Sequence, residues 1–301
     1  MTAPGGQADE PRTLVDPTTG RPILMAPRRQ HRPMLTAAGA AAAPCPFCPG
    51  NEAETPPTIE ALPATGTWTA RAFPNKFPAN HHHEVIAEGG EHAEQPADLD
   101  RTAWRTCLEL WQRRVRAIEQ RPGIACTFLF KNVGALAGAS IAHNHSQVIG
   151  LPALPPRLQL ELAAAGSGPG CPWCAAAATA ERDGRLVHRA KQHVVIAPEP
   201  PKLPHETWLL PARCDDDFLA TDLDSLADAL HALFVAIARG LGRPAFNLWL
   251  HRVPGARFHW HFELQPRTGQ MAGLELGGDM YINSLPAVVS AGRLRAGLAA
   301  R

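Results

Sequence analysis

KNVGALAGASIAHNHSQVIG, residues 131–150, is the stretch around which the chain is organised. In an extended segment side chains alternate between two faces, so His143 and His145 project to the same side. The small residues ahead of them let a backbone approach a phosphate closely and offer its N–H groups. A neutral imidazole is a competent nucleophile toward phosphorus, and a covalent intermediate divides one difficult transfer into two easier ones. The pattern indicates phosphoryl-group chemistry, although two histidines and some glycines could also form an ordinary strand and turn.

Residues 139–147, ASIAHNHSQ, resemble the active-site strand of the galactose-1-phosphate uridylyltransferase branch of the histidine triad superfamily, with its His-x-His-x-Gln signature. The resemblance implies that His145 takes the nucleotidyl group, that His143 is a zinc ligand, and that Gln147 holds phosphate oxygens. Asn144 stands where transferases of that branch carry proline. This difference bears on the substrate rather than on the chemistry.

Length and composition limit the classes of protein to which the chain can belong. A chain of 301 residues, 45% of them hydrophobic, can bury one large core or two of ordinary size. The net charge of +1 gives no field that would recruit nucleic acid or an anionic membrane, so we expect neither as a partner. No apolar run approaches the ~18 residues of a membrane-spanning helix, and the first residues lack a signal-peptide pattern. The seven cysteines include two Cys-x-x-Cys pairs, which fit metal or redox use in a reducing compartment. We therefore expect a cytoplasmic globular protein.

The second half of the chain repeats features of the first in the same order. CPFC at Cys45 is matched by CPWC at Cys171, and HNHSQ at His143 is matched by HWHFE at His259. Internal similarity of this kind indicates a duplicated structural unit. We expect an α+β fold of two tandem histidine-triad-like units, each an antiparallel sheet with a packed helix.

An amphipathic helix occupies the same place in each half. Apolar residues recur at three- and four-residue steps over residues 98–121, and residues 223–241 show a second such pattern. We expect a catalytic unit over residues 13–156 and a degenerate partner over residues 157–301. Only the first half has a small-residue loop and a glutamine after its His-x-His, so we expect His261 to be a structural or dimer-edge residue rather than a second nucleophile.

The repeat also predicts two metal sites. Each half offers a Cys-x-x-Cys pair, a histidine or cysteine after the strand that begins with His-Glu, and the first histidine of its His-x-His. Four donors of these types form closed tetrahedral zinc sites. Cys214 follows His205 by the same nine residues that separate His92 from His83, although His205 or His251 could replace Cys214, or each pair could be a metal-free turn. We therefore expect two zinc ions per chain. The predicted ligands are Cys45, Cys48, His92 and His143 in the first half, and Cys171, Cys174, Cys214 and His259 in the second.

Further contacts are implied by the resemblance. Two arginines in residues 16–33 match the family's opening segment near bound phosphates, although a basic cluster alone would be a solvated loop. Residues 71–79 resemble the family's nucleotide-contacting loop, and residues 271–286 resemble the carboxyl-terminal segment of the branch that includes nucleoside-diphosphate-sugar phosphorylases. The expected nucleotide contacts are Arg29, Arg32, Asn75, Lys76, Asn132, Gly138, Ala139 and Ser140.

We expect a nucleotidyltransferase of carbohydrate metabolism, of the galactose-1-phosphate uridylyltransferase type, that moves UMP from a UDP-sugar to a hexose 1-phosphate and acts as a homodimer. His145 would attack the α-phosphorus, while Gln147 and backbone N–H groups near residues 138–140 stabilise charge on the phosphoryl oxygens. One alternative is a phosphorylase that uses inorganic phosphate as the acceptor and acts on an ADP- or UDP-sugar or on a dinucleoside polyphosphate. Another is a non-catalytic, zinc-stabilised nucleotide-binding module. A hydrolase is disfavoured, because hydrolases of the superfamily carry a third histidine at the position of Gln147.

Overall fold

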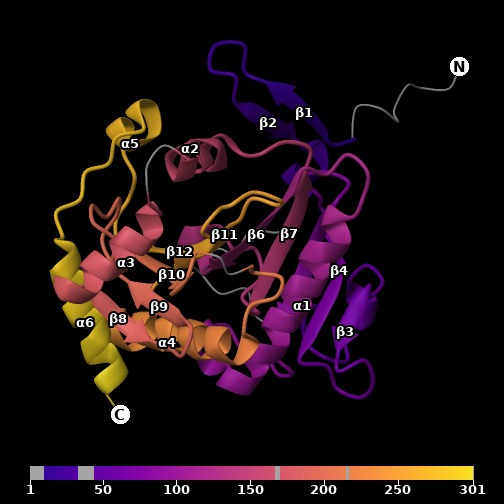
Figure 1. Ribbon diagram of the computed structural model, residues 1–301. Coiled ribbons are helices and arrows are strands. Elements are labelled where there is room, and N and C mark those ends of the chain that lie inside the picture. Colours follow the sequence, from indigo (N-terminus) through magenta and orange to yellow (C-terminus); the bar gives the residue numbers. More distant parts are fainter. Residues whose placement is uncertain (1–9, 33–43, 167–169, 215–216, 301) are drawn as a thin grey trace, which may run out of the picture.

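The computed structural model describes residues 10–32, 44–166, 170–214 and 217–300, and within these ten strands form the main sheet (Figure 1). The strands of the first half are β3 (Glu60–Leu62), β4 (Ala70–Pro74), β5 (His83–Glu88), β6 (Cys126–Val133) and β7 (His145–Leu151). Those of the second half are β8 (Leu186–Arg189), β9 (His193–Ile196), β10 (Thr207–Pro211), β11 (Phe246–His251) and β12 (His261–Pro266).

The two halves share this sheet. The strand order is β3-β4-β5-β7-β6-β11-β12-β10-β9-β8, and every neighbouring pair is antiparallel. From the centre of the sheet outward, the first half runs β6-β7-β5-β4-β3 and the second half runs β11-β12-β10-β9-β8, so both halves have the same order of strands. The predicted α+β fold, with an antiparallel sheet and a packed helix in each half, is confirmed. The pairing of β6 with β11, which joins the halves edge to edge, was not predicted from the sequence.

Helices α1 (Arg101–Glu119) and α4 (Leu223–Leu241) lie side by side against one face of the sheet (Figure 1). The predicted apolar stripe of α1 is buried, and Trp104 packs on Phe234 of α4 with 4.8 Å between ring centroids. Asp100 caps α1, because its carboxylate accepts the Ala103 N–H at 2.7 Å. Burial of each such aromatic side chain contributes roughly 1.5–3 kcal/mol, so the two halves are held by a shared core.

Shorter elements complete the described chain. The remaining α-helices are α2 (Pro156–Gly166), α3 (Pro172–Arg182), α5 (Gly273–Gly278) and α6 (Ala287–Ala299). The 3-10 turns are η1 (Pro27–His31), η2 (Glu52–Glu54), η3 (Pro96–Asp98) and η4 (Ala135–Ala137). No helix in the described ranges is long and apolar enough to cross a membrane.

A hairpin of β1 (Arg12–Val15) and β2 (Pro22–Met25) lies outside the main sheet. An ion pair of 3.7 Å between Arg21 and Asp279 links it to the segment around α5. Both pieces expose large apolar side chains to solvent: Leu14, Val15, Ile23, Leu24, Met25, Met271, Leu274, Leu276, Met280, Tyr281 and Ile282. We call this set the terminal apolar patch.

The registers of the two halves correct one match made from the sequence. The carbonyl oxygen of Glu88 accepts the Nε2–H of His143, and that of Pro211 accepts the Nε2–H of His259. Glu88 therefore corresponds to Pro211. By the same offset, His83 corresponds to Glu206 and not to His205. The reason is that the second-half strand begins only at Thr207, after a left-handed residue at position 205 with φ 63°. The equal nine-residue intervals do not mark equivalent positions.

Candidate active site and metal-binding groups

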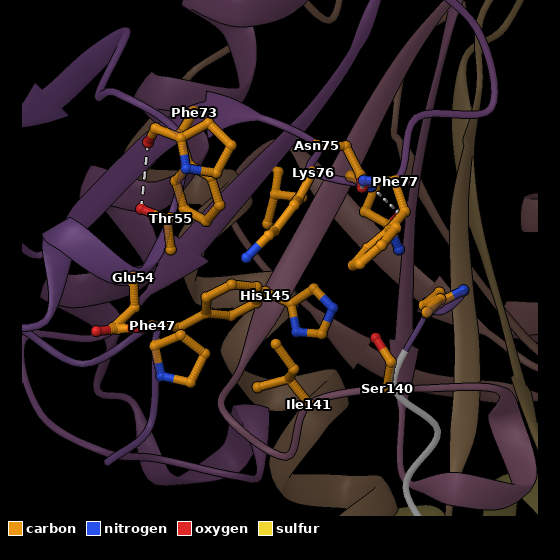
Figure 2. Close-up of a pocket in the computed structure, with 15 residues that line it drawn as sticks. Phe47, Glu54, Thr55, Phe73, Asn75, Lys76, Phe77, Ser140, Ile141 and His145 are labelled. Carbon is orange, nitrogen blue, oxygen red and sulfur yellow. Dashed lines mark hydrogen bonds between the residues drawn. The ribbon is translucent and has the colours of Figure 1, made fainter. Parts of the chain in front are cut away.

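A cavity of about 190 Å³ opens beside the start of β7. Its walls are largely apolar, with Phe47, Phe73, Phe77 and Ile141 among them. The polar side chains that reach it include Arg32, Asn75, Lys76, Ser140, His145 and Gln147. Figure 2 shows His145 in the middle of this group, between the β4 side of the cavity and the loop that carries Ser140. Apolar walls with a few convergent polar groups are typical of a small-molecule site.

The cavity brings together many of the residues predicted from the sequence. Arg29, Asn132, Gly138 and Ala139 are not among the described residues that line it. Arg29 and Gly138 contact lining residues instead: Arg29 donates to the Phe77 carbonyl at 2.9 Å, and the Gly138 carbonyl accepts from Arg32 at 3.2 Å. Asn132 accepts a hydrogen bond of 2.7 Å from Asn247 of the other half.

The expected cradle of backbone N–H groups is smaller than predicted. The Gly138 N–H donates to the Ala135 carbonyl at 2.9 Å, and the Ala139 N–H donates to the Gly134 carbonyl at 3.2 Å. These donors already satisfy the turn, so in this conformation neither is available to a phosphate. Within residues 138–140, the cavity is reached by Ser140.

His145 is held as a neutral base. Its Nδ1–H donates to the His143 carbonyl at 2.8 Å, which leaves the Nε2 lone pair free. Burial lowers the pKa of His145 from 6.5 to about 3, so the ring is unprotonated at neutral pH. Phe47 presents its ring to His145 at 5.2 Å between centroids and to His143 at 6.3 Å, so both histidines lie on the same side, as predicted.

Gln147 has a fixed amide orientation. Its Oε1 lies 3.0 Å from His83 Nε2 and accepts from Asn75 Nδ2 at 3.3 Å. The Ala79 N–H donates to His83 Nδ1 at 3.0 Å, so the proton of His83 is on Nε2 and is donated to Gln147. The Gln147 amide NH₂ is thereby left for a ligand in the cavity. His83 was not predicted as a site residue. The signal for it in the sequence is that a histidine begins a buried strand.

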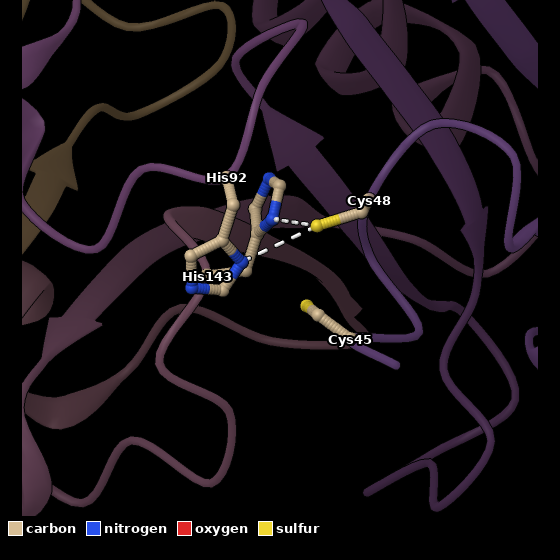
Figure 3. Close-up of side chains that lie close together, drawn as sticks. All are labelled: Cys45, Cys48, His92 and His143. Atoms are coloured by element: carbon tan, nitrogen blue, oxygen red, sulfur yellow. Dashed lines mark hydrogen bonds between the residues drawn. The ribbon is translucent and has the colours of Figure 1, made fainter. Parts of the chain in front are cut away.

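Four predicted metal ligands of the first half converge (Figure 3). One donor atom from each of Cys45, Cys48, His92 and His143 lies within 4.8 Å of the others. Cys48 Sγ is 3.3 Å from His92 Nδ1 and 3.5 Å from His143 Nδ1. A tetrahedral ion with Zn–S of ~2.3 Å and Zn–N of ~2.0 Å separates S and N donors by about 3.5 Å. The hydrogen bond from His143 Nε2 to Glu88 leaves Nδ1 as the donor, which is the usual outer-shell arrangement. The group fits a tetrahedral metal ion.

The chain is similar in sequence to several known proteins. Residues 36–154 match a family described as the N-terminal domain of a domain of unknown function (DUF4931). The chain is 27% identical to an ADP-glucose phosphorylase of Arabidopsis thaliana over 93% of this chain and 92% of that protein. It is 22% identical to a galactose-1-phosphate uridylyltransferase of Thermotoga maritima over 93% and 96% of the two chains.

A solved structure extends the likeness to the whole fold. The crystal structure of an Arabidopsis thaliana ADP-glucose phosphorylase with bound ADP-glucose superposes with a TM-score of 0.77, covering 95% of this chain and 99% of that one at 27% identity. The predicted resemblance to the galactose-1-phosphate uridylyltransferase-like branch of the histidine triad superfamily is confirmed by these relatives.

The second half of the chain holds another candidate metal group. Cys171 Sγ is 3.2 Å and Cys174 Sγ is 3.6 Å from His259 Nδ1. Cys214 lines the same pocket and contributes to the raised pKa of Cys174, whose largest cause is burial. Cys214 therefore lies next to the group, although the three donors that fall within 4.8 Å of one another are those of Cys171, Cys174 and His259. Here the Cys-x-x-Cys pair opens a helix, α3, whereas the first-half pair lies in a turn.

The two alternative ligands for Cys214 lie elsewhere. His205 Nδ1 is 3.0 Å from Ser290 Oγ, and His251 Nδ1 is 2.8 Å from Glu161 Oε2. Neither replaces Cys214 in the metal group. His251 belongs to a different cluster, with Glu161, His261 and Glu263, which by its donor atoms could also hold a metal ion.

The second half has no nucleophile site of the first-half kind among its described residues. His261 Nδ1 bonds to the His259 carbonyl at 3.0 Å, as His145 does to His143. Glu263, however, takes the place of Gln147, and it is paired with Arg157 at 3.0 Å and Lys202 at 2.9 Å. A charge-paired carboxylate replaces the amide that would contact a phosphate.

Proposed function

We propose that this chain transfers a nucleoside monophosphate from a nucleoside-diphosphate sugar to a phosphorylated acceptor through a covalent intermediate on His145. The observation that carries the proposal is the state of that ring: neutral, with its Nδ1–H bonded to the His143 carbonyl and its other nitrogen free at a ligand-sized cavity. A nucleophile of this kind needs no separate base, because the attacking nitrogen carries no proton.

In the proposed first step, His145 Nε2 attacks the α-phosphorus, the bond to the bridging oxygen breaks, and sugar 1-phosphate leaves. In the second step, a phosphate oxygen of the acceptor attacks the same phosphorus and the P–N bond breaks, which restores His145. The Gln147 amide and the charged groups of Arg32 and Lys76 would stabilise charge on the phosphoryl oxygens. Proximity of these groups to the nucleophile supports this assignment.

Two acceptors are supported by different observations. Likeness to the Thermotoga maritima uridylyltransferase favours UMP transfer from a UDP-sugar to a hexose 1-phosphate. The greater identity to the Arabidopsis thaliana ADP-glucose phosphorylase favours inorganic phosphate, with a nucleoside diphosphate and sugar 1-phosphate as products. Both reactions pass through the same nucleotidyl-histidine.

The test is a matrix of donors and acceptors. UDP-glucose and ADP-glucose are each incubated with galactose 1-phosphate or with inorganic phosphate, and all products are separated by anion-exchange chromatography. The His145→Gly variant is the matched control. Turnover in one or more combinations, absent from the variant, supports the proposal, and the active combination identifies the acceptor. Binding of both nucleotide sugars without turnover in any combination would leave a nucleotide-binding module instead.

We further propose that both cysteine-histidine groups hold zinc. When bound, zinc in the first half would fix His143, two residues before the nucleophile, and zinc in both groups would stabilise the fold. In the first half the ligands would be Cys45, Cys48, His92 and His143. In the second they would be Cys171, Cys174, His259 and Cys214. Free thiols that serve as metal donors fit a reducing compartment, which supports a cytoplasmic location.

We also propose a homodimer, with a unit boundary near residue 156. The repeated strand order supports units of 13–156 and 157–301. The terminal apolar patch supports self-association, because a monomeric protein rarely leaves so many large apolar side chains exposed together. Light scattering of the parent and of Leu276→Glu tests this: the parent should have the mass of a dimer and the variant that of a monomer.

A further inference from the structure

A buried ion pair lies directly behind the candidate nucleophile. Lys131 on β6 and Glu88 on β5 are paired with no exposed side-chain surface on either partner. The Glu88 carboxylate also accepts the Trp111 Nε1–H at 2.9 Å and the Ser146 hydroxyl at 2.5 Å. Lys131 Nζ lies 5.5 Å from the Trp104 ring, so the pair is on the helix side of the sheet.

This pair holds the main chain that carries His145. Lys131 Nζ donates to the His145 carbonyl at 3.0 Å, and Ser146, bonded to Glu88, is the next residue along the strand. The Glu88 carbonyl accepts from His143, whose own carbonyl fixes the His145 ring. Glu88 and Lys131 therefore contact the chain at residues 143, 145 and 146, on both sides of the His145 peptide unit and at its carbonyl.

The second half provides an internal comparison. Phe130 pairs with Gln147 just as Trp249 pairs with Glu263, so Lys131 corresponds to Leu250. Glu88 corresponds to Pro211 by the matched histidine hydrogen bonds, and Ser146 corresponds to Phe262. All three counterparts are apolar and buried. The same strand order thus forms without the ion pair, where the nucleophile site is absent.

Taking two charges out of water is costly, and a buried ion pair is often no more stabilising than apolar residues of similar volume. The fold itself therefore gives no reason to retain the pair. We propose that Lys131 and Glu88 are positioning residues that hold the strand beneath His145 so that its Nε2 stays aligned with the α-phosphorus. This inference rests on the proposed nucleotidyl transfer.

The test uses Lys131→Met combined with Glu88→Gln, because glutamine still accepts from Trp111 and Ser146 and no buried charge is left unpaired. The measurements are the dissociation constant for UDP-glucose and ADP-glucose, the single-turnover rate of nucleotidyl-enzyme formation, metal content and the urea midpoint. We expect the rate to fall ~10- to 100-fold, since misplacement of a reacting group by about 1 Å has effects of that size. Binding should change less than about twofold, as the cavity residues are untouched.

A matched control removes another buried pair of the same half. Arg114 and Glu84 are joined at 2.8 Å between α1 and β5 and make no contact with His145. Arg114→Met with Glu84→Gln should leave the rate of adduct formation at the parent value. Ser146→Ala disturbs the proposed network least, and should lower the rate less than the double variant while keeping the parent's urea midpoint.

The outcomes are distinguishable. A parent rate of adduct formation in both the double variant and Ser146→Ala would overturn the positioning role. So would an equal loss of rate in the Arg114/Glu84 control, which would indicate a general loss of stability. No adduct in the parent itself would refute the nucleotidyl-histidine, which is the failure of the proposed function rather than of the ion pair alone.

Discussion

His83 should control catalysis through Gln147 without touching the substrate. Replacement by phenylalanine keeps a ring in the buried site but removes the Nε2–H that is 3.0 Å from Gln147 Oε1. Asn75, at 3.3 Å, would then be the remaining donor to that oxygen. Loss of one buried hydrogen bond costs about 1–2 kcal/mol. If that energy serves only to orient the amide in the transition state, kcat falls roughly 5- to 30-fold.

The assay is steady-state turnover of the active nucleotide sugar by His83→Phe, Gln147→Ala and the variant with both changes. Gln147→Ala should lose about 10²- to 10³-fold, the usual effect of one transition-state donor. Because His83 is expected to act through Gln147, His83→Phe should add little in the Gln147→Ala background. His81→Phe, at an exposed neighbour, is the control.

Two results would refute this reasoning. If the two losses multiply, His83 contributes independently of Gln147. If His83→Phe raises KM with kcat unchanged, its effect is on ground-state binding rather than on the transition state.

Three further predictions concern metal binding and stability. Elemental analysis should find close to one zinc per chain in Cys214→Ala and close to two in Cys214→His, because histidine also serves as a ligand in tetrahedral sites. Two zinc ions in the alanine variant would exclude Cys214 as a ligand. Burial lowers the pKa of His193 to about 4 in the folded state, so the unfolded chain takes up its proton first as pH falls below 6.5. The free energy of unfolding should therefore fall between pH 6.5 and 4, by ~2 kcal/mol at pH 5 from this group. Urea titrations at pH 7 and pH 5 should show a correspondingly smaller decrease in His193→Gln than in the parent. A decrease equal to the parent's would contradict the assignment. Gly134→Ala should lower the free energy of unfolding by about 2–4 kcal/mol, since Gly134 has φ 81° and the added Cβ would lie 2.9 Å from that of Ala245; a urea midpoint equal to the parent's would show that the loop adapts.

Local pattern was enough to predict the two long helices, α1 and α4, and the convergence of the first metal group. The stripe that predicted a helix over residues 98–121 corresponds to α1, which is shorter because Asp100 is its cap. The fixed Cys-x-x-Cys and His-x-His spacings identified donors that lie far apart in the chain. Each of these features depends on the spacing of residues that are close together in the chain, so each could be predicted from the sequence.

Features that depend on pairing between distant strands were not predictable in this way. Nothing in residues 126–133 indicates that β6 pairs with β11 rather than forming an edge. The partnership of His83 with Gln147 depends on the register of β5 against β7, and the occupied N–H groups of Gly138 and Ala139 depend on the turn of the loop. The charge of Lys131, within an apolar strand, was visible, but its partner on another strand was not.

The most direct test of the account is whether His145 becomes nucleotidylated. The parent chain is incubated with UDP-glucose or ADP-glucose labelled at the α-phosphorus, without acceptor, and is quenched in alkali, where a phosphoramidate survives. Peptide mass spectrometry then locates the modification. The account predicts one nucleotidyl group on His145, which is discharged when inorganic phosphate or a hexose 1-phosphate is added and does not form in His145→Gly. Label on another residue such as His261, or full turnover by His145→Gly, would contradict it.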